Sequence, residues 1–166
     1  CLETEAPVVH TALQILTHDW QDVFGVKPQM CLFDGDLIVG TWESSLIRQT
    51  GIDVSMLRGK HEAFLLTVSP KGRLIIAGSD KRGTAYGIME LSRLIGVSPW
   101  EWWADVIPEP RKEFALPASY KDLQEPSVDF RGIFINDEDW GLMPWSSKNY
   151  EPADQQQIGP RTNRRI

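Results

Sequence analysis

Two stretches of the chain carry apolar residues at the spacing of an amphipathic helix. In residues 7–24 the apolar positions recur every three or four residues, and Gly25 is a suitable end for the helix. These positions share one helical face: Val9, Leu13, Leu16, Trp20 and Val23. A second stripe runs through residues 83–95, followed by Gly96 as a C-cap. Gly87 lies on its apolar side, which would let this helix approach a sheet closely.

Shorter apolar runs between the two helical stretches predict strands. Residues 37–40 are apolar and bounded by polar residues, which favours a buried strand, and residues 43–50 favour a short helix. Residues 63–68 and 73–77 flank the turn 69–72, which contains Pro and Gly at suitable places, so they predict a β-hairpin. Together the elements predict an α+β fold with a small mixed β-sheet and two main amphipathic helices.

The pattern changes in residues 98–125. Prolines at positions 108, 110 and 117 punctuate this segment, and we interpret it as an extended connector that wraps the first domain. Pro126 marks the expected boundary. The expected organisation is therefore an amino-terminal α+β domain with its connector in residues 1–125, and a second domain that begins at residue 126.

The second domain opens with an apolar run that ends in polar residues. Residues 133–135 predict a buried strand, and four polar side chains follow it directly, with a tryptophan after them: Asn136, Asp137, Glu138, Asp139 and Trp140. A strand that delivers acidic groups at its carboxyl end is typical of the catalytic face of a (β/α)8 barrel. Such carboxylates could act as general acid or base, or hydrogen-bond sugar hydroxyls, whereas a solvated loop is the alternative interpretation.

The junction between the hairpin and the second helix is another candidate site. It lacks the glycine spacing of a nucleotide-binding loop, which argues against a nucleotide-binding or redox α/β domain. Ser79 or Asp80 could simply cap the helix. Lys81 and Arg82 are harder to explain by capping, because cations oppose the helix dipole at this end, and they are candidate binding residues.

Three tryptophans, Trp100, Trp102 and Trp103, cluster in the connector. They could stack against a sugar, but we favour a structural role in which they seal the connector onto the domain.

Composition narrows the possible classes of function. A net charge of −6 gives no reason to expect nucleic acid, and no apolar run is long enough to span a bilayer. No signal peptide occurs within these residues. Cys1 and Cys31 show no metal-binding spacing, so no metal or cofactor is expected. Cys1 could be a lipid-modified residue, although a boundary inside a strand is the favoured interpretation.

Three blocks of the sequence resemble glycoside hydrolase family 115, the α-glucuronidases that act on glucuronoxylan. Residues 95–106 and 131–142 carry the more specific similarity, and residues 78–88 carry a looser one. The looser block also resembles the amino-terminal α+β domain of families 20, 67 and 84, which is the hexosaminidase-like domain.

The resemblance implies that residues 126–166 hold the start of an incomplete catalytic barrel. It implies a polysaccharide or oligosaccharide substrate, with removal of glucuronic or 4-O-methylglucuronic acid by inversion. Asp137 would then be catalytic, and five residues would bind substrate: Asn136, Glu138, Lys81, Arg82 and Trp140. The parent protein would be exported to the periplasm or cell surface and could be a homodimer. This chain alone is expected to be inactive. The alternative function is a non-catalytic accessory or carbohydrate-binding module.

Overall fold

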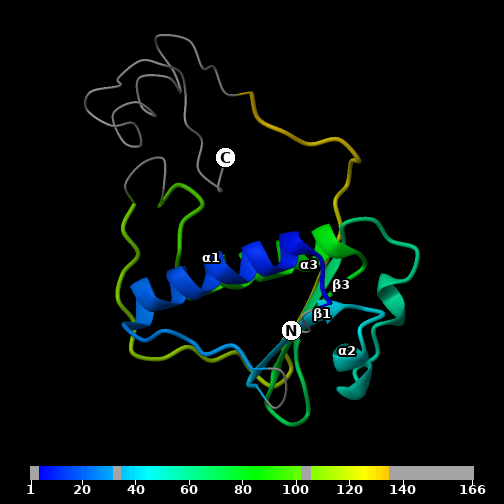
Figure 1. Cartoon of the computed structure of the whole chain (residues 1–166), viewed down its shortest axis with the longest axis horizontal. Helices are drawn as coiled ribbons and strands as arrows, with labels where there is room; N and C mark the ends of the chain where they lie inside the picture. The colour runs from blue at the N-terminus through cyan, green and yellow to red at the C-terminus, as the bar shows by residue number, and fades with distance from the viewer. Residues whose placement is uncertain (1–3, 32–34, 102–105, 135–166) are drawn as a thin grey trace. The chain divides into compact units, whose positions relative to one another are not determined.

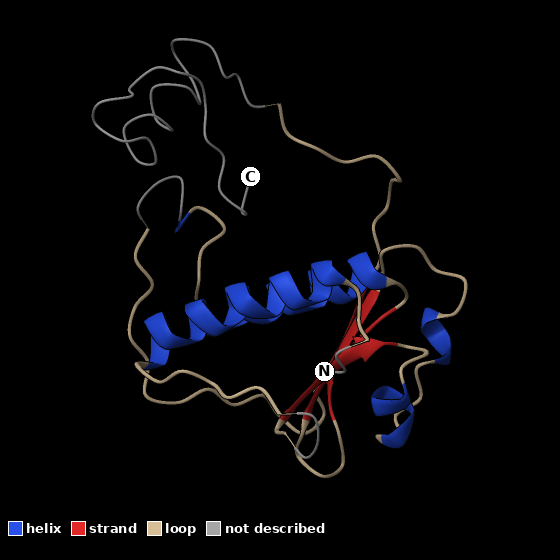
Figure 2. Ribbon diagram, in the orientation of Figure 1, coloured by secondary structure: helices blue, strands red, loops and turns tan. Residues whose placement is uncertain are grey.

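The computed structural model describes residues 4–31, 35–101 and 106–134. The chain divides into two compact units, Cys1–Ser127 and Val128–Ile166, and all of the described helices and strands lie in the first. In chain order they are α1 (Pro7–Phe24), β1 (Leu37–Thr41), α2 (Ser45–Gln49), the 3₁₀ helix η1 (Ser55–Leu57), β2 (Phe64–Val68), β3 (Leu74–Gly78), α3 (Lys81–Ile95) and β4 (Lys121–Gln124). Figures 1 and 2 show how these elements are arranged.

The four strands form one mixed sheet in the order β1-β3-β2-β4. β1 runs parallel to β3, and Val39 pairs with Ile76. β3 and β2 form the predicted antiparallel hairpin, in which Leu66 also pairs with Ile76. β4 adds an antiparallel edge to β2, with Leu123 opposite Leu65. The predicted α+β fold with a small mixed sheet is therefore confirmed.

Side chains that alternate along the strands build a separate core on each face of the sheet. One face carries Phe64, Leu66 and Ile76, and these pack under α1 and α3. The other face carries Leu65, Ile75 and Ala77, and these pack against Ile47 of α2 and Leu57 of η1. Because successive strand residues point to opposite faces, the continuous apolar runs of β2 and β3 fill both cores.

The two long helices lie side by side over the first core. Helix α1 starts with Pro7 at its amino end and stops at Gly25, whose φ of 71° is left-handed. Helix α3 approaches the sheet closely, because a Cβ on Gly87 would lie only 2.6 Å from Ile76 Cγ2. The predicted role of Gly87 is thus confirmed. A buried contact joins the helices, since the Ser92 hydroxyl donates a hydrogen bond to the Asp19 carboxylate.

Strand β4 was not among the predicted elements, because residues 98–125 were interpreted as a connector throughout. The strand is short and polar, and Leu123 is its one apolar residue. Its position depends on tertiary contacts: Thr67 Oγ1 donates to the Tyr120 carbonyl over 2.8 Å, and Lys60 pairs with Glu125. An edge strand needs only one neighbour, so it requires less β-propensity than a central strand.

The described part of the second unit, residues 128–134, contains no helix or strand. Ile133 and Phe134 are 77% and 92% exposed, and Phe130 is 96% exposed. The predicted strand at residues 133–135 is therefore absent at Ile133 and Phe134, which have no neighbouring strand in the described ranges. Residue 135 and those after it lie outside the described residues, so the barrel stays a prediction.

Candidate functional site

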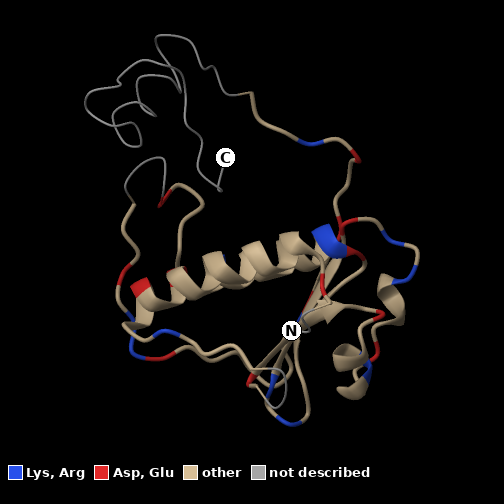
Figure 3. Ribbon diagram, viewed as in Figure 1, with Lys and Arg blue, Asp and Glu red and all other residues tan. Residues whose placement is uncertain are grey.

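The predicted site residues fall into two groups. Asn136, Asp137, Glu138 and Trp140 lie outside the described residues. Lys81 and Arg82 are described, and they occupy the first two positions of α3. Figure 3 shows these basic residues at the start of the helix. The geometry of the site can therefore be built around the junction of β3 and α3.

Asp80 caps α3 and joins it to the loop before β2. Its Oδ1 accepts hydrogen bonds from the backbone N–H groups of Arg82 at 2.9 Å and Gly83 at 2.8 Å. Its Oδ2 accepts a third from the backbone N–H of Glu62 at 2.8 Å. The sequence interpretation of Asp80 as the cap is confirmed, but the link to Glu62 is a tertiary contact that the sequence does not show.

These contacts favour the ionised form of Asp80. Burial raises the pKa of its carboxyl, but the three backbone N–H groups and the nearby His61 together hold the pKa below its ordinary value of 3.8. His61 Nδ1 lies 3.5 Å from Asp80 Oδ2. The start of α3 therefore carries a fixed negative charge at neutral pH.

Glu62 is the most unusual residue of this region. Its φ of 53° lies in the left-handed region, and it is the one non-glycine residue with positive φ among the described residues. Its side chain is only 1% exposed, and its Oε1 lies 2.9 Å from Arg82 Nη1. Buried carboxylates require a partner of opposite charge, so Arg82 stabilises the burial of Glu62.

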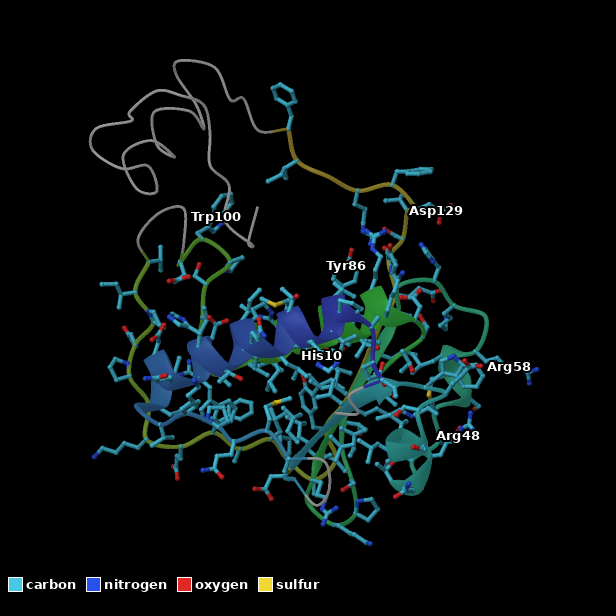
Figure 4. All side chains as sticks on the ribbon, in the orientation of Figure 1. His10, Arg48, Arg58, Tyr86, Trp100 and Asp129 are labelled. Carbon is cyan, nitrogen blue, oxygen red and sulfur yellow. The ribbon has the colours of Figure 1, made fainter. Side chains whose placement is uncertain are left out.

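Arg82 is held on a second side by Tyr86, one helical turn further along α3. Its Nη2 donates to Tyr86 Oη over 3.2 Å, while the Arg82 side chain stays 58% exposed. We name His61, Glu62, Asp80, Arg82 and Tyr86 the corner cluster; Tyr86 is labelled in Figure 4. The cluster gathers charged and hydrogen-bonding groups from one loop and one helix end.

Lys81 and Arg82 therefore differ in their surroundings. Lys81 is exposed on the first turn of α3 and makes no ion pair within the described residues, whereas Arg82 is anchored by Glu62 and Tyr86. This anchoring offsets the unfavourable position of a cation at a helix amino terminus. Sequence reasoning missed Glu62, His61 and Tyr86, because nothing in their spacing indicates that the loop before β2 packs on α3.

The tryptophan cluster is described only in part. Trp100 is 61% exposed, so the favoured interpretation that it seals the core is wrong for this residue (Figure 4). The core under α1 and α3 contains Phe64 and is covered by other partly buried aromatic side chains, among them Trp20 and Phe114, while Trp100 stays at the surface. Trp102 and Trp103 lie outside the described residues.

A cavity of about 290 Å³ lies elsewhere in the first unit, between α1, the β2–β3 turn and the connector. Leucine side chains dominate its wall, together with Trp20, Phe114 and Asp36. Sugars need several polar partners, so this lining does not suit a carbohydrate. Within the described ranges no helix is long and apolar enough to cross a membrane, and no group of His, Cys, Asp and Glu could hold a metal ion.

Comparisons with known proteins agree on one family. The sequence profile of Glycosyl hydrolase family 115 matches residues 123–166. A solved structure of a family GH115 4-O-methyl-α-glucuronidase, described as specific for decorated arabinogalactans, is 57% identical, with a TM-score of 0.87. The match covers 93% of this chain and 20% of that chain, so the chain spans about one fifth of the enzyme's length. No curated protein gives a significant match.

The two matches are complementary along the chain. The family profile covers the segment with the Asn136–Asp139 cluster, and the structural match extends over the α+β unit that carries the corner cluster. At 57% identity the similarity concerns the family as well as the fold. The resemblance to glycoside hydrolase family 115 that was found in the sequence is therefore confirmed, by the family profile over residues 123–166 and by the 57% identical structure.

Proposed function

We propose that the longer protein containing this chain is an α-glucuronidase that removes glucuronic or 4-O-methylglucuronic acid side chains from a plant polysaccharide. The observation that carries the proposal is the 57% identity, over 93% of this chain, to a 4-O-methyl-α-glucuronidase of the same family. The proposal concerns the longer protein, because this chain covers one fifth of the matched enzyme.

Two polysaccharides are the candidate substrates. The family resemblance favours glucuronoxylan, and the matched enzyme is described as specific for decorated arabinogalactans. Both carry the same terminal sugar, so the chemistry at the scissile bond is shared and the difference lies in the sugars beyond it. Both are extracellular polymers, which is consistent with export of the protein.

The proposed reaction is hydrolysis with inversion at the anomeric carbon. Inversion requires an acid and a base on opposite faces of the sugar, with room for a water between them. Asp137 is the proposed catalytic carboxylate of this chain. Asn136, Glu138 and Trp140 are proposed to bind the substrate beside it, and Lys81 and Arg82 to meet the uronate carboxylate, for which a guanidinium is well suited.

We also propose that this chain alone is inactive. Residues 1–125 would form the small α+β domain, and residues 126–166 would supply only the first strand and part of the first helix of the barrel. A complete barrel takes about 250 residues, and the remaining catalytic groups would lie on its later strands.

Release of the uronic acid tests the function. The full-length protein and this chain are incubated separately with glucuronoxylan and with glucuronidated arabinogalactan, and free 4-O-methylglucuronic acid is measured. Release by the full-length protein alone is the expected result. If the full-length protein released no uronic acid from either polymer, the hydrolase proposal would be wrong.

A carbohydrate-binding module is the second candidate function, favoured by the exposure of Trp100. Binding of this chain to either polysaccharide, lost in Trp100→Ala and accompanied by no hydrolysis in the full-length protein, would support it. Aromatic side chains at a surface suit the apolar face of a pyranose, so the same residue could also assist an active hydrolase.

A further inference from the structure

The two edges of the sheet differ in what lies beside them. At the β1 edge, the Glu5 carboxylate accepts a hydrogen bond from the Thr41 N–H over 3.1 Å, which uses a backbone donor and places a negative charge there. At the opposite edge, β4 pairs with β2 on one side, and no strand lies on its other side within the described residues. An open edge strand can pair with a strand of another chain.

The register of β4 shows which of its backbone groups point away from the sheet. The Val68 N–H donates to the Tyr120 carbonyl over 3.2 Å, so these two residues form a hydrogen-bonded pair. Hydrogen-bonded pairs alternate with non-hydrogen-bonded pairs along an antiparallel ladder, which makes Lys121 and Leu123 the non-bonded positions of β4. The N–H and C=O groups of Lys121 and Leu123 therefore point outward from the sheet, toward the place of a further strand.

The side chains at alternate positions of this edge carry a cation, an apolar group and an anion. Leu123 lies opposite Leu65 and is 42% exposed. Lys121, two residues before it, is exposed and makes no ion pair within the described ranges. Glu125, two residues after it, is 45% exposed and contacts Lys60. Because alternate strand residues share a face, these three side chains lie in a row.

This row is complementary to itself when a second β4 runs antiparallel. With Leu123 opposite Leu123 of the second copy, Lys121 of each copy lies opposite Glu125 of the other. Opposite charges across neighbouring strands are favourable. The neighbouring registers, centred on Asp122 or Gln124, place Lys121 or Glu125 opposite Leu123 and form no such charge pair. The charges therefore favour the register centred on Leu123.

We propose that two copies of the protein associate through β4 as a symmetric antiparallel pair that joins their sheets. The same surface then serves on both copies, as a twofold dimer requires. The outward backbone groups of Lys121 and Leu123 form the new hydrogen bonds, and a Lys121–Glu125 pair lies on each side of the leucine contact. The contact is short, so the dimer is expected to be weak and reversible. The proposal does not depend on the hydrolase activity proposed above.

Sedimentation equilibrium of the full-length protein and of two charge variants tests this pairing. Lys121→Glu places an anion opposite Glu125 of the second copy, and Glu125→Lys places a cation opposite Lys121. Each variant alone should raise the dissociation constant of the dimer about tenfold, because attraction is replaced by repulsion at two places. Lys27→Glu is the matched control, since Lys27 is exposed after the end of α1 and lies outside the sheet.

Mixing the two variants separates pairing through β4 from a general effect of charge. In a mixed dimer, the two acidic positions of one copy lie opposite the two basic positions of the other. Association of the mixture should therefore return to about the level of the unmutated protein. A variant that had merely lost its fold would not be rescued in this way, and circular dichroism of each variant checks the fold directly.

Several results would overturn the proposal. The unmutated protein could remain a monomer up to about 100 μM, or form a dimer that neither variant weakens. The variants could also stay dissociated when mixed, or Lys27→Glu could weaken the dimer as much as they do. Release of uronic acid is measured separately, so a failure of the dimer and a failure of the proposed function are distinguishable.

Discussion

The Ser92 hydroxyl donates a hydrogen bond to the Asp19 carboxylate at the interface of α1 and α3, and both side chains are buried. This is a polar contact beside a mainly apolar core. It fixes the register of two helices that the sequence presents only as separate apolar stripes. A hydrogen bond to a buried charged group contributes more to the free energy of unfolding than an average hydrogen bond. The reason is that a buried charged group that loses a hydrogen-bond donor pays a large desolvation penalty.

We expect Ser92→Ala to lower the free energy of unfolding by about 1–3 kcal/mol. The variant removes a donor from a carboxylate that stays buried between the helices. Urea unfolding of this chain, followed by circular dichroism, measures the change. Asp22→Asn is the control, because Asp22 pairs with His18 at the surface and exposed pairs contribute less than about 1 kcal/mol. Equal effects of the two variants would contradict the prediction.

Gly83→Ala should be among the most destabilising single substitutions in the first unit. The new methyl group would lie 2.1 Å from a backbone carbonyl oxygen, which cannot rotate away as a side chain can. Overpacking of this kind costs about 1–3 kcal/mol and more where the backbone must move. Thermal unfolding measures the loss. Gly132→Ala serves as the control, since open space surrounds that position, and it should leave the melting temperature unchanged.

The free energy of unfolding of this chain should fall at acidic pH, because the Asp80 carboxylate becomes protonated there. The pKa of the folded state lies below the ordinary value of 3.8, so the contribution is complete above about pH 4 and is lost as the pH falls through the lower folded pKa. Asp80→Asn keeps a capping side chain but cannot titrate. The difference in unfolding free energy between the two proteins should shrink below pH 4. A difference that is constant from pH 2 to pH 7 would contradict this assignment.

The exposed apolar residues of the second unit should cause self-association of this chain. Phe130 and Phe134 are almost completely exposed, which is unusual for aromatic side chains of a soluble protein. The double variant Phe130→Ser, Phe134→Ser should shift the sedimentation profile toward the monomer. Trp100→Ser, at an exposed position of the first unit, provides a control for the general effect of removing an apolar group.

If Asp137 is the catalytic carboxylate proposed above, Asp137→Ala in the full-length protein should reduce kcat by about a thousandfold or more, because the loss of an essential acid or base removes that much of the rate. KM should change little in comparison. Asp129→Ala, which changes an exposed carboxylate of the described segment, is the control. A kcat reduced less than tenfold by Asp137→Ala would exclude Asp137 from the catalytic pair.

The helices and the hairpin could be predicted from the sequence because their signals are local. The apolar stripe and Gly25 gave the bounds of α1, and Gly87 indicated a close approach of α3 to the sheet, as the structure shows. Strand β4 could not be found in this way, since its polar residues are ordered by pairing with β2. Tertiary contacts set the position of β4, and they outweigh the low β-propensity of its residues.

The candidate site could be predicted only in part. Arg82 was singled out because a cation is unexpected at the start of a helix, but its partner Glu62 has no sequence signal. Their pairing depends on the loop before β2 folding onto α3. For Trp100 the prediction from the sequence was wrong. A large aromatic residue in a connector suggests a buried side chain, but Trp100 is exposed.

The order of the sheet also has a consequence for how the chain folds. β2, β3 and α3 are contiguous in the chain, so their contacts close short loops, whereas the pairing of Leu37 with Leu74 and of Leu65 with Leu123 closes long ones. Local contacts form at lower entropic cost, and the hairpin with α3 is therefore the expected nucleus. Substitutions there should slow refolding, while substitutions in α1 or β4 should chiefly accelerate unfolding.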